Sequence, residues 1–362
     1  MEMDMSEVKI EGWLADSVDA PAALVLREFL SPVEGKDGVF FPPTFAAAEN
    51  SKEFPGGYNI NELGNGENVC LVDSVGSQAN RIEPMFATGD YAALVPQLVV
   101  EAGEKKVSIL EAGHRAGDAI VRCTELKDAL QTAFQALMKG NAVPLAKLAP
   151  TSLVFGVWDS RDTQAKAPRL LAATIRAFNV AKLTRSAAYS PAVDYVREEL
   201  LEEYEDKKDL KDRYSKQGFL QALSSWSHGG IVSKGDIRRE VTLQIAALRL
   251  LRGATDGETK KLRAYLLGLA LVAFTKPAVG FLRQGCNLVL DGDRKPESNV
   301  VYPDGRREAS GLTHEMALAF AKKAASSFGV GESKTVKFDT KLAKDEATGE
   351  GKKKGPKKAK AE

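Results

Sequence analysis

The segment Trp158–Arg169 contains the side chains best suited to contacting a nucleic acid. Its sequence, WDSRDTQAKAPR, combines an indole with cations and amides. Cations attract phosphates, and bases stack on indole and guanidinium planes, as in the recognition of single-stranded RNA. Such a segment forms either one wall of an RNA groove or a solvated hairpin tip with one packed tryptophan. The candidate residues are Trp158, Arg161, Thr163, Gln164, Lys166 and Arg169.

A second polar group lies within Cys70–Phe86, where apolar residues at helical spacing predict a helix. Its polar side would suit contacts with the backbone of an extended polyanion, although a solvated helix face is the simpler interpretation. Its candidate residues are Ser77, Gln78, Asn80 and Arg81. The segment Glu111–Arg122 adds His114 and Arg115.

A third group follows the glycine-rich segment Ser224–Gly235, which is predicted to be a loop and contains Lys234. Asp236–Arg252 is predicted to be a helix with Asp236 as its N-cap. Arg238 and Arg239 would then lie in the first turn, where cations oppose the helix dipole. Either an anionic partner or an ion pair with Glu240 or Asp236 would explain them.

The catalytic patterns are weak by comparison. The three histidines lack metal-ligand spacing, and no motif for a nucleophile or a phosphate loop is present. Asp118, Asp159 and Asp162 could together hold a divalent metal, so a metal-dependent ribonuclease is the alternative function. A metabolic enzyme with a pocket near Trp158 is a third hypothesis. The sequence favours a binding or scaffold protein that is not an enzyme and has no cofactor.

The composition is that of a globular protein. The 362 residues are 44% hydrophobic and 27% charged, with a net charge of +1. Residues 341–362 hold eight lysines and four acids, which leaves 42 basic and 45 acidic residues in the rest. Any nucleic-acid site is therefore a local groove. Three dispersed cysteines and an acidic start without a signal peptide predict a cytoplasmic protein.

The elements that would position these side chains follow from hydrophobic patterning. Strands are predicted at Ala22–Leu30, Tyr91–Val100, Val107–Leu110, Ser152–Val157 and Val279–Leu290. Helices are predicted at Leu126–Met138, Leu262–Phe274 and Thr313–Phe328, together with an exposed charged helix over Ala188–Lys216 whose Tyr195, Leu200, Tyr204 and Leu210 point inward. Residues 33–68 look like a loop inserted after the first strand, which packs against its own body.

Four segments in order resemble one known family. DSVGSQANRIEPMF, LEAGHRAGDAIVR, TSLVFGVWDSRDTQAKAPRL and GGIVSKGDIRREV look like the backbone subunit of type I-G CRISPR effector complexes, formerly called type I-U. Their order and spacing match across residues 22–290. The sequence nevertheless lacks the aromatic RNP pattern of ordinary RRM domains, so base stacking on the sheet face is not expected.

The resemblance implies an α/β (α+β) fold with an RRM-like, ferredoxin-like core of the RAMP superfamily, elaborated into a hand-like shape. Residues 1–340 would form one domain, with an insertion at about 33–68 and a helical insertion at about 188–275. Residues 341–362 would be a disordered lysine-rich tail.

The resemblance also implies a function without catalysis. Copies would stack head to tail along CRISPR RNA in a Cascade surveillance complex for antiviral defence, with the guide paired to target DNA. The partners would include the large subunit and the subunit that binds the end of the CRISPR RNA, but no membrane. A projecting hairpin would interrupt the guide–target duplex, supplied by Trp158–Arg169 or by Val33–Asn68. The three polar groups above would line the RNA channel.

Overall fold

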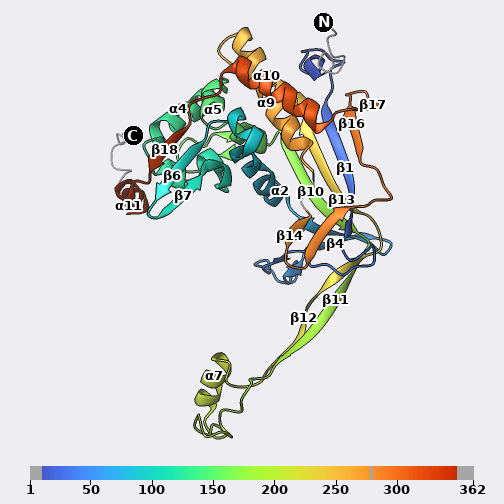
Figure 1. Ribbon diagram of the computed structural model, residues 1–362, viewed down its shortest axis with the longest axis vertical. Helices are drawn as coiled ribbons and strands as arrows, with labels where there is room; N and C mark the ends of the chain where they lie inside the picture. Colours follow the sequence, from blue (N-terminus) through green and yellow to red (C-terminus); the bar gives the residue numbers. More distant parts are fainter. Residues whose placement is uncertain (1–9, 278–279, 349–362) are drawn as a thin grey trace, which may run out of the picture.

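The computed structural model describes residues 10–277 and 280–348. It is a mixed α/β structure with a curled antiparallel sheet, compatible with an RRM-like core that carries insertions (Figure 1). The strand order is β14-β15-β1-β13-β10-β5-β4, and β16 also pairs with β1. Figure 1 shows this sheet on one side, a helical lobe on the other, and a long ribbon that projects away from both.

The centre of the sheet has the βαββαβ order of a ferredoxin-like fold. Strand β1 (Ala23–Pro32) pairs antiparallel with β13 (Ile237–Gln244), which pairs antiparallel with β10 (Leu171–Phe178). Strands β15 (Cys286–Leu290) and β16 (Glu297–Val301) pair with the two ends of β1 on its other side. The outer strands are β4 (Ile60–Gly64), β5 (Glu67–Asp73), β14 (Phe281–Arg283) and β17 (Arg307–Ala309). The predicted first strand is confirmed.

One long helix packs against this sheet, and a second helix packs on the first. Helix α9 (Asp256–Phe274) is buried along most of its length, as expected of a helix that is apolar on all sides. Helix α10 (His314–Phe328) crosses it closely, because a Cβ on Gly268 would lie 2.8 Å from Cα of Ala321. The helices predicted at these positions are confirmed, including the cap at Gly329.

The second lobe contains the helices α3 (Ala119–Arg122), α4 (Lys127–Met138), α5 (Val143–Leu148) and α6 (Pro150–Phe155). A three-stranded sheet joins β6 (Leu98–Ala102) and β7 (Lys105–Ser108) to the C-terminal strand β18 (Lys334–Lys337). The prediction for α4 is confirmed, whereas the predicted strand at Ser152–Val157 is wrong. These residues form α6 and the start of β8, because Pro150 begins a helix and a short apolar run suits a buried helix equally well.

Two strand predictions in this lobe are correct only in part. The segment predicted as Tyr91–Val100 begins with a 3-10 helix, η2 (Gly89–Leu94), and becomes a strand only at β6. The segment predicted as Val107–Leu110 is the end of β7 followed by another 3-10 turn.

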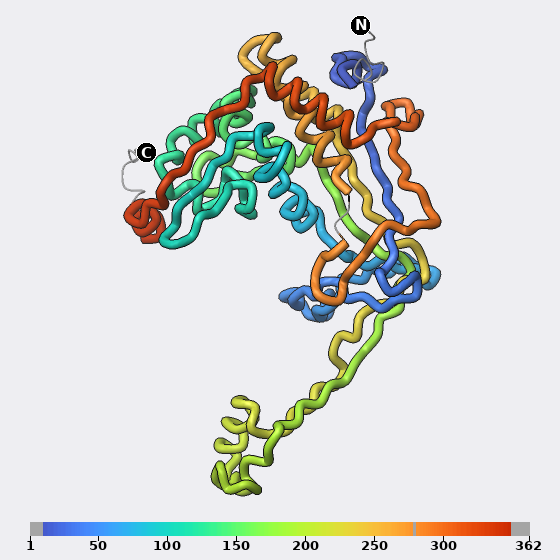
Figure 2. The backbone as a smooth tube through the Cα atoms, viewed as in Figure 1, coloured from blue at the N-terminus to red at the C-terminus, as the bar shows by residue number. Residues whose placement is uncertain are grey.

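The projecting element is a two-stranded ribbon of β11 (Val180–Tyr189) and β12 (Ala222–Ser233) (Figures 1 and 2). Helix α7 (Lys208–Lys216) lies at its tip, where the rings of Tyr195 and Tyr214 contact Phe219. The predicted charged helix over Ala188–Lys216 is therefore helical only in α7, and Leu200 is exposed rather than inward. The predicted loop Ser224–Gly235 is mostly strand β12.

The predicted helix Asp236–Arg252 is instead strand β13 followed by the short helix α8 (Ile245–Arg249). Burial alternates along β13, and Arg239 occupies one of the buried positions. Because a charged residue occupies one of the inward positions, the alternation of apolar and polar residues that marks a strand is not visible in the sequence. Residues 188–275 therefore do not form a helical insertion, since they include a central strand of the sheet.

The segment predicted as one strand at Val279–Leu290 is the hairpin β14–β15 over the described residues 280–290. Gly285 adopts a φ of +73° at its turn, which favours glycine. Val279 lies outside the described residues.

Residues 33–68 pack against the base of the ribbon, as expected. Phe40 is buried and forms a β-bridge with Ile231, and the Tyr58 hydroxyl accepts a hydrogen bond from Gly230 N at 3.0 Å. The insertion contains β2 (Thr44–Phe45) and β3 (Gly57–Tyr58) in addition to β4. It therefore buttresses the ribbon and is not itself the projecting hairpin.

Residues near the C-terminus differ from the prediction of disorder, since Thr340–Thr348 form helix α11. The remaining tail residues, 349–362, lie outside the described residues. Within the described ranges, no helix has the length and apolar character needed to cross a membrane.

Candidate nucleic-acid interface

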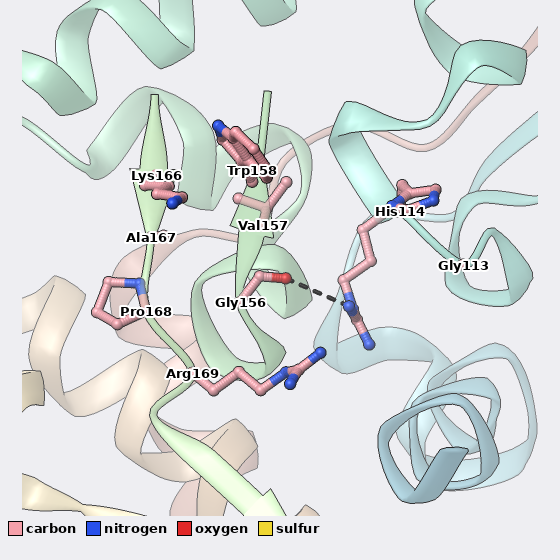
Figure 3. Close-up of a pocket in the computed structure, with 10 residues that line it drawn as sticks. Gly113, His114, Gly156, Val157, Trp158, Lys166, Ala167, Pro168 and Arg169 are labelled. Atoms are coloured by element: carbon pink, nitrogen blue, oxygen red, sulfur yellow. Dashed lines mark hydrogen bonds between the residues drawn. The ribbon is translucent and has the colours of Figure 1, made fainter. Parts of the chain in front are cut away.

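A cavity of about 410 Å³ brings together five of the residues that the sequence singled out (Figure 3). Two of them follow η3 (Ile109–Glu111), two lie on the hairpin of β8 (Val157–Trp158) and β9 (Lys166–Ala167), and one follows that hairpin. The five residues are His114, Arg115, Trp158, Lys166 and Arg169. They and the glycine and apolar residues between them are called the arginine pocket below.

The hairpin presents Trp158 at the rim of the pocket. Trp158 pairs with Lys166 across the two strands, and its side chain is half exposed. The Lys166 ammonium lies 4.3 Å from the centroid of the indole, where a cation is attracted by the ring face. Figure 3 shows both side chains at the same end of the hairpin.

The loop between the two strands is held by its own polar groups. The buried Asp159 carboxylate accepts hydrogen bonds from N and Oγ1 of Thr163, at 2.8 and 2.6 Å. The Gln164 side chain donates to the Ser160 carbonyl at 2.6 Å. Thr163 and Gln164 therefore shape the loop, whereas Arg161 is exposed on it.

Two arginines meet at the C-terminal end of α6, where free carbonyls attract cations. Arg169 Nε donates to the Phe155 carbonyl at 2.9 Å, and Arg115 Nη1 donates to the Gly156 carbonyl at 3.2 Å. Gly156 has a φ of +84°, and a Cβ there would lie 2.7 Å from Cγ of Arg169. Both the backbone conformation and the close approach therefore require glycine.

Arg115 is buried but not fully satisfied. Its Nε donates to Glu83 at 2.6 Å, while its Nη2 has no hydrogen-bond partner among the described residues. Burial, with the repulsion of Arg115, lowers the pKa of Arg169. A buried donor without a partner beside a second guanidinium is an arrangement that an oxyanion would satisfy.

Glu83 provides a pH-dependent test of this buried pair. Burial raises the pKa of Glu83 to about 7, with the charge of Arg115 opposing the shift. Between the ordinary value of 4.5 and about 7, the folded chain holds a proton that the unfolded chain has released. The contribution of Glu83 to stability therefore falls as the pH rises through this range. We expect the melting temperature of the native protein to fall relative to that of Glu83→Gln over this range. A difference independent of pH would contradict this prediction.

The carboxylates proposed for a nuclease are engaged separately. Asp118 accepts from Ile120 N at 3.1 Å and caps α3, Asp159 holds its loop, and Asp162 lies 3.8 Å from Arg122 Nε. Across residues 10–277 and 280–348, no group of three histidine, cysteine or acidic side chains is placed to hold a metal.

The polar residues of α2 (Val75–Ile82) belong to a different, largely internal network. Ser77, Gln78 and Arg81 all donate to the buried Asp73 carboxylate, at 2.8, 2.7 and 3.2 Å. Gln78 also accepts from Arg239 Nε at 3.1 Å, and both of these side chains are buried.

Gln78 and Arg239 are therefore occupied inside the protein, which corrects their predicted place on an RNA-binding surface. Asp73 lies only five residues before Gln78 in the sequence, whereas Glu28 becomes a neighbour of Arg239 only in the fold. Asn80 and Lys234 are exposed, and the Arg238 guanidinium stacks 3.8 Å from the centroid of Phe178. None of these residues lines the arginine pocket.

The sequence interpretation missed three residues of this region. Glu83 ends a helical pattern in the sequence, and its buried partner Arg115 lies 32 residues further along the chain. Arg122 and Lys127 flank a second cavity beside the pocket. Arg122 ends the motif LEAGHRAGDAIVR, which was the available signal.

The fold and the pocket together define an α/β protein with a ferredoxin-like sheet and a cationic site containing an exposed tryptophan. A family model described as CRISPR-associated protein GSU0053 (Cas_GSU0053) matches residues 24–182, and this match supports a family of CRISPR-associated proteins. The matched region extends from β1 to the start of the ribbon and includes every residue of the arginine pocket. A search of curated proteins finds no match.

Proposed function

We propose that this protein is a non-catalytic, guide-RNA-binding backbone subunit of a type I Cascade complex, the role that its resemblance to type I-G subunits implies. Copies of the chain would stack along CRISPR RNA and work with other Cas proteins, and the guide would pair with target DNA. The match to a CRISPR-associated family and the RRM-like sheet support this proposal.

The observation that carries the proposal is the arginine pocket. A phosphate would be bound by Arg169 and by the unpartnered Nη2 of Arg115, while a base would stack on Trp158. These contacts read the backbone and the π face of any base, so they are independent of sequence. This is what a protein needs if base pairing, rather than the protein, selects the target.

The ribbon β11–β12 is the best candidate for the hairpin that interrupts the guide–target duplex. It replaces both segments suggested by the sequence, since Trp158–Arg169 forms the pocket and residues 33–68 support the ribbon. It extends the β10–β13 connection far from the body (Figure 2). Trp226 is 83% exposed on it, with a φ of +59° near a register shift, and offers an apolar plane to a base.

Binding of a labelled single-stranded oligoribonucleotide tests the proposal. We expect Trp158→Ala and Arg169→Ala each to weaken binding by about 1–3 kcal/mol, because each loses a base or phosphate contact. Arg307→Ala on β17 is the matched control, since it removes one exposed cation away from the pocket. The slope of log affinity against log salt should decrease by about 0.7 in Arg169→Ala.

Two results would contradict the proposal. The first is equal affinity of the pocket variants and the Arg307→Ala control. The second is cleavage of the RNA in the presence of Mg²⁺ or Mn²⁺ that Asp159→Ala abolishes, which would favour the metal-dependent ribonuclease that uses Asp118, Asp159 and Asp162.

A further inference from the structure

Helix α11 crosses a second cavity, of about 1010 Å³, beside the arginine pocket. The two cavities share His114 and Trp158, so they form one continuous region of surface. Arg122, Lys127 and Arg161 line the body side of the second cavity, and Leu342 and Glu346 of α11 line the other side. Asp118 and Asp162 also line the body side, so the three cations there outnumber the acids by one. Part of the same chain thus covers a surface that adjoins a candidate RNA site and carries three cations.

The contact between α11 and this surface centres on one carboxylate. Glu346 accepts hydrogen bonds from Lys127 Nζ at 2.7 Å and from Arg122 Nε at 3.0 Å. Burial opposes ionisation, but these two cations hold the pKa of Glu346 below its ordinary value. Asp162 is the other acid near Arg122, at 3.8 Å, and is the more distant of the two. Glu346 therefore provides the main compensating charge for both cations.

The rest of α11 is weakly held. None of its residues is fully buried, and the two residues that lead into it make two backbone hydrogen bonds to the body, from Phe338 N to the Glu101 carbonyl at 2.9 Å and from Asp339 N to the Cys123 carbonyl at 2.8 Å. The three ionised side chains remain partly exposed, at 15% for Arg122, 24% for Lys127 and 23% for Glu346. Partly buried ion pairs are screened by salt less than exposed ones. A phosphate can nevertheless replace the Glu346 carboxylate, because it offers the same two cations an anion of at least equal charge.

We propose that Arg122 and Lys127 form a second phosphate-binding site for single-stranded RNA, and that α11 closes it by placing Glu346 between the two cations. This inference rests on the proposed function of the arginine pocket. RNA that enters the pocket presents its next phosphates to the same surface, where they displace Glu346 and release α11. The chain without RNA then keeps two cations neutralised, and binding of RNA opens the site.

Glu346→Gln in the full chain tests the inference, with RNA affinity measured at low salt. The variant keeps the shape of the side chain but removes the charge, so affinity should rise about fivefold or more. Asp345→Asn is the matched control, because it removes one charge from the same helix at a residue that forms no ion pair within the described part of the chain, and should change affinity much less. Arg122→Ala should weaken binding more in the Glu346→Gln background than when Glu346 must first be displaced.

Hydrogen exchange gives an independent readout. Adding RNA to the native protein should increase exchange of the α11 amides, whereas Glu346→Gln should show fast exchange without RNA. Equal affinities of Glu346→Gln and Asp345→Asn, with binding still dependent on Arg169, would overturn this inference alone. Failure of every variant and of the native protein to bind RNA would overturn the proposed function as well.

Discussion

Arg239→Leu is expected to lower the free energy of unfolding by about 3–5 kcal/mol, since it leaves a buried carboxylate without its partner. Arg239 and Glu28 lie directly opposite each other on β13 and β1, in the middle of the sheet. Arg239 Nη1 donates to Glu28 at 2.5 Å, and its Nε donates to Gln78 on α2. Urea denaturation followed by circular dichroism would measure the change.

The double variant Glu28→Leu/Arg239→Leu is the control for this prediction. It removes both charges, so part of the lost stability should return. RNA affinity measured below the unfolding transition should stay close to that of the native protein, because neither side chain is exposed. A stable Arg239→Leu variant that failed to bind RNA would instead show that Arg239 contacts the RNA directly.

Shortening the ribbon is expected to abolish assembly of several copies on a guide RNA without unfolding the body. Residues 186–226 would be replaced by Asn-Gly, a two-residue turn that suits the flanking pair Arg185–Ser227. This design keeps the contacts of Ile231 and Gly230 with residues 33–68. The melting temperature and the binding of a short RNA should persist, because the arginine pocket is intact. Mass photometry on a full-length guide would show single copies rather than arrays.

Trp226→Ala tests the proposed interruption of the duplex separately from the assembly that the shortened variant tests. It should preserve the arrays but reduce the exposure of unpaired target bases to chemical modification, because the exposed indole is lost. Regular arrays formed by the shortened variant would contradict the role of the ribbon in assembly.

The sequence predicts those parts of the fold in which apolar residues recur at one spacing along a long segment. Helices α4, α9 and α10 show continuous apolar faces, and strand β1 is mostly apolar, interrupted by Arg27 and Glu28. Helix α6 contains the short apolar run Leu153–Phe155, which fits a strand and a buried helix equally well. Strand β13 was mistaken for a helix because a buried ion pair placed Arg239 where an apolar residue would mark the strand.

Separation along the sequence explains which site residues could be predicted. Trp158, Lys166 and Arg169 lie close together in the sequence, so their chemistry is visible there, and Arg115 shares a short motif with His114. Glu346 is 224 residues from Arg122, and Glu83 is 32 residues from Arg115. Such pairs depend on how the lobes fold together, and no local pattern indicates them. Gln78 is engaged by Asp73, which is five residues away, and by Arg239, which is 161 residues away and reaches it only in the fold.

The support at the base of the ribbon has a mechanical consequence. Gly57 lies so close to His228 that a Cβ on this glycine would be 2.5 Å from the imidazole Cε1, and Phe40 bridges to Ile231 just beyond. Because these contacts fix the base of the ribbon, the ribbon keeps its direction relative to the body. Under the proposed function, the protein itself, and not the RNA, would then act as the ruler that fixes the interval between successive interruptions of the duplex.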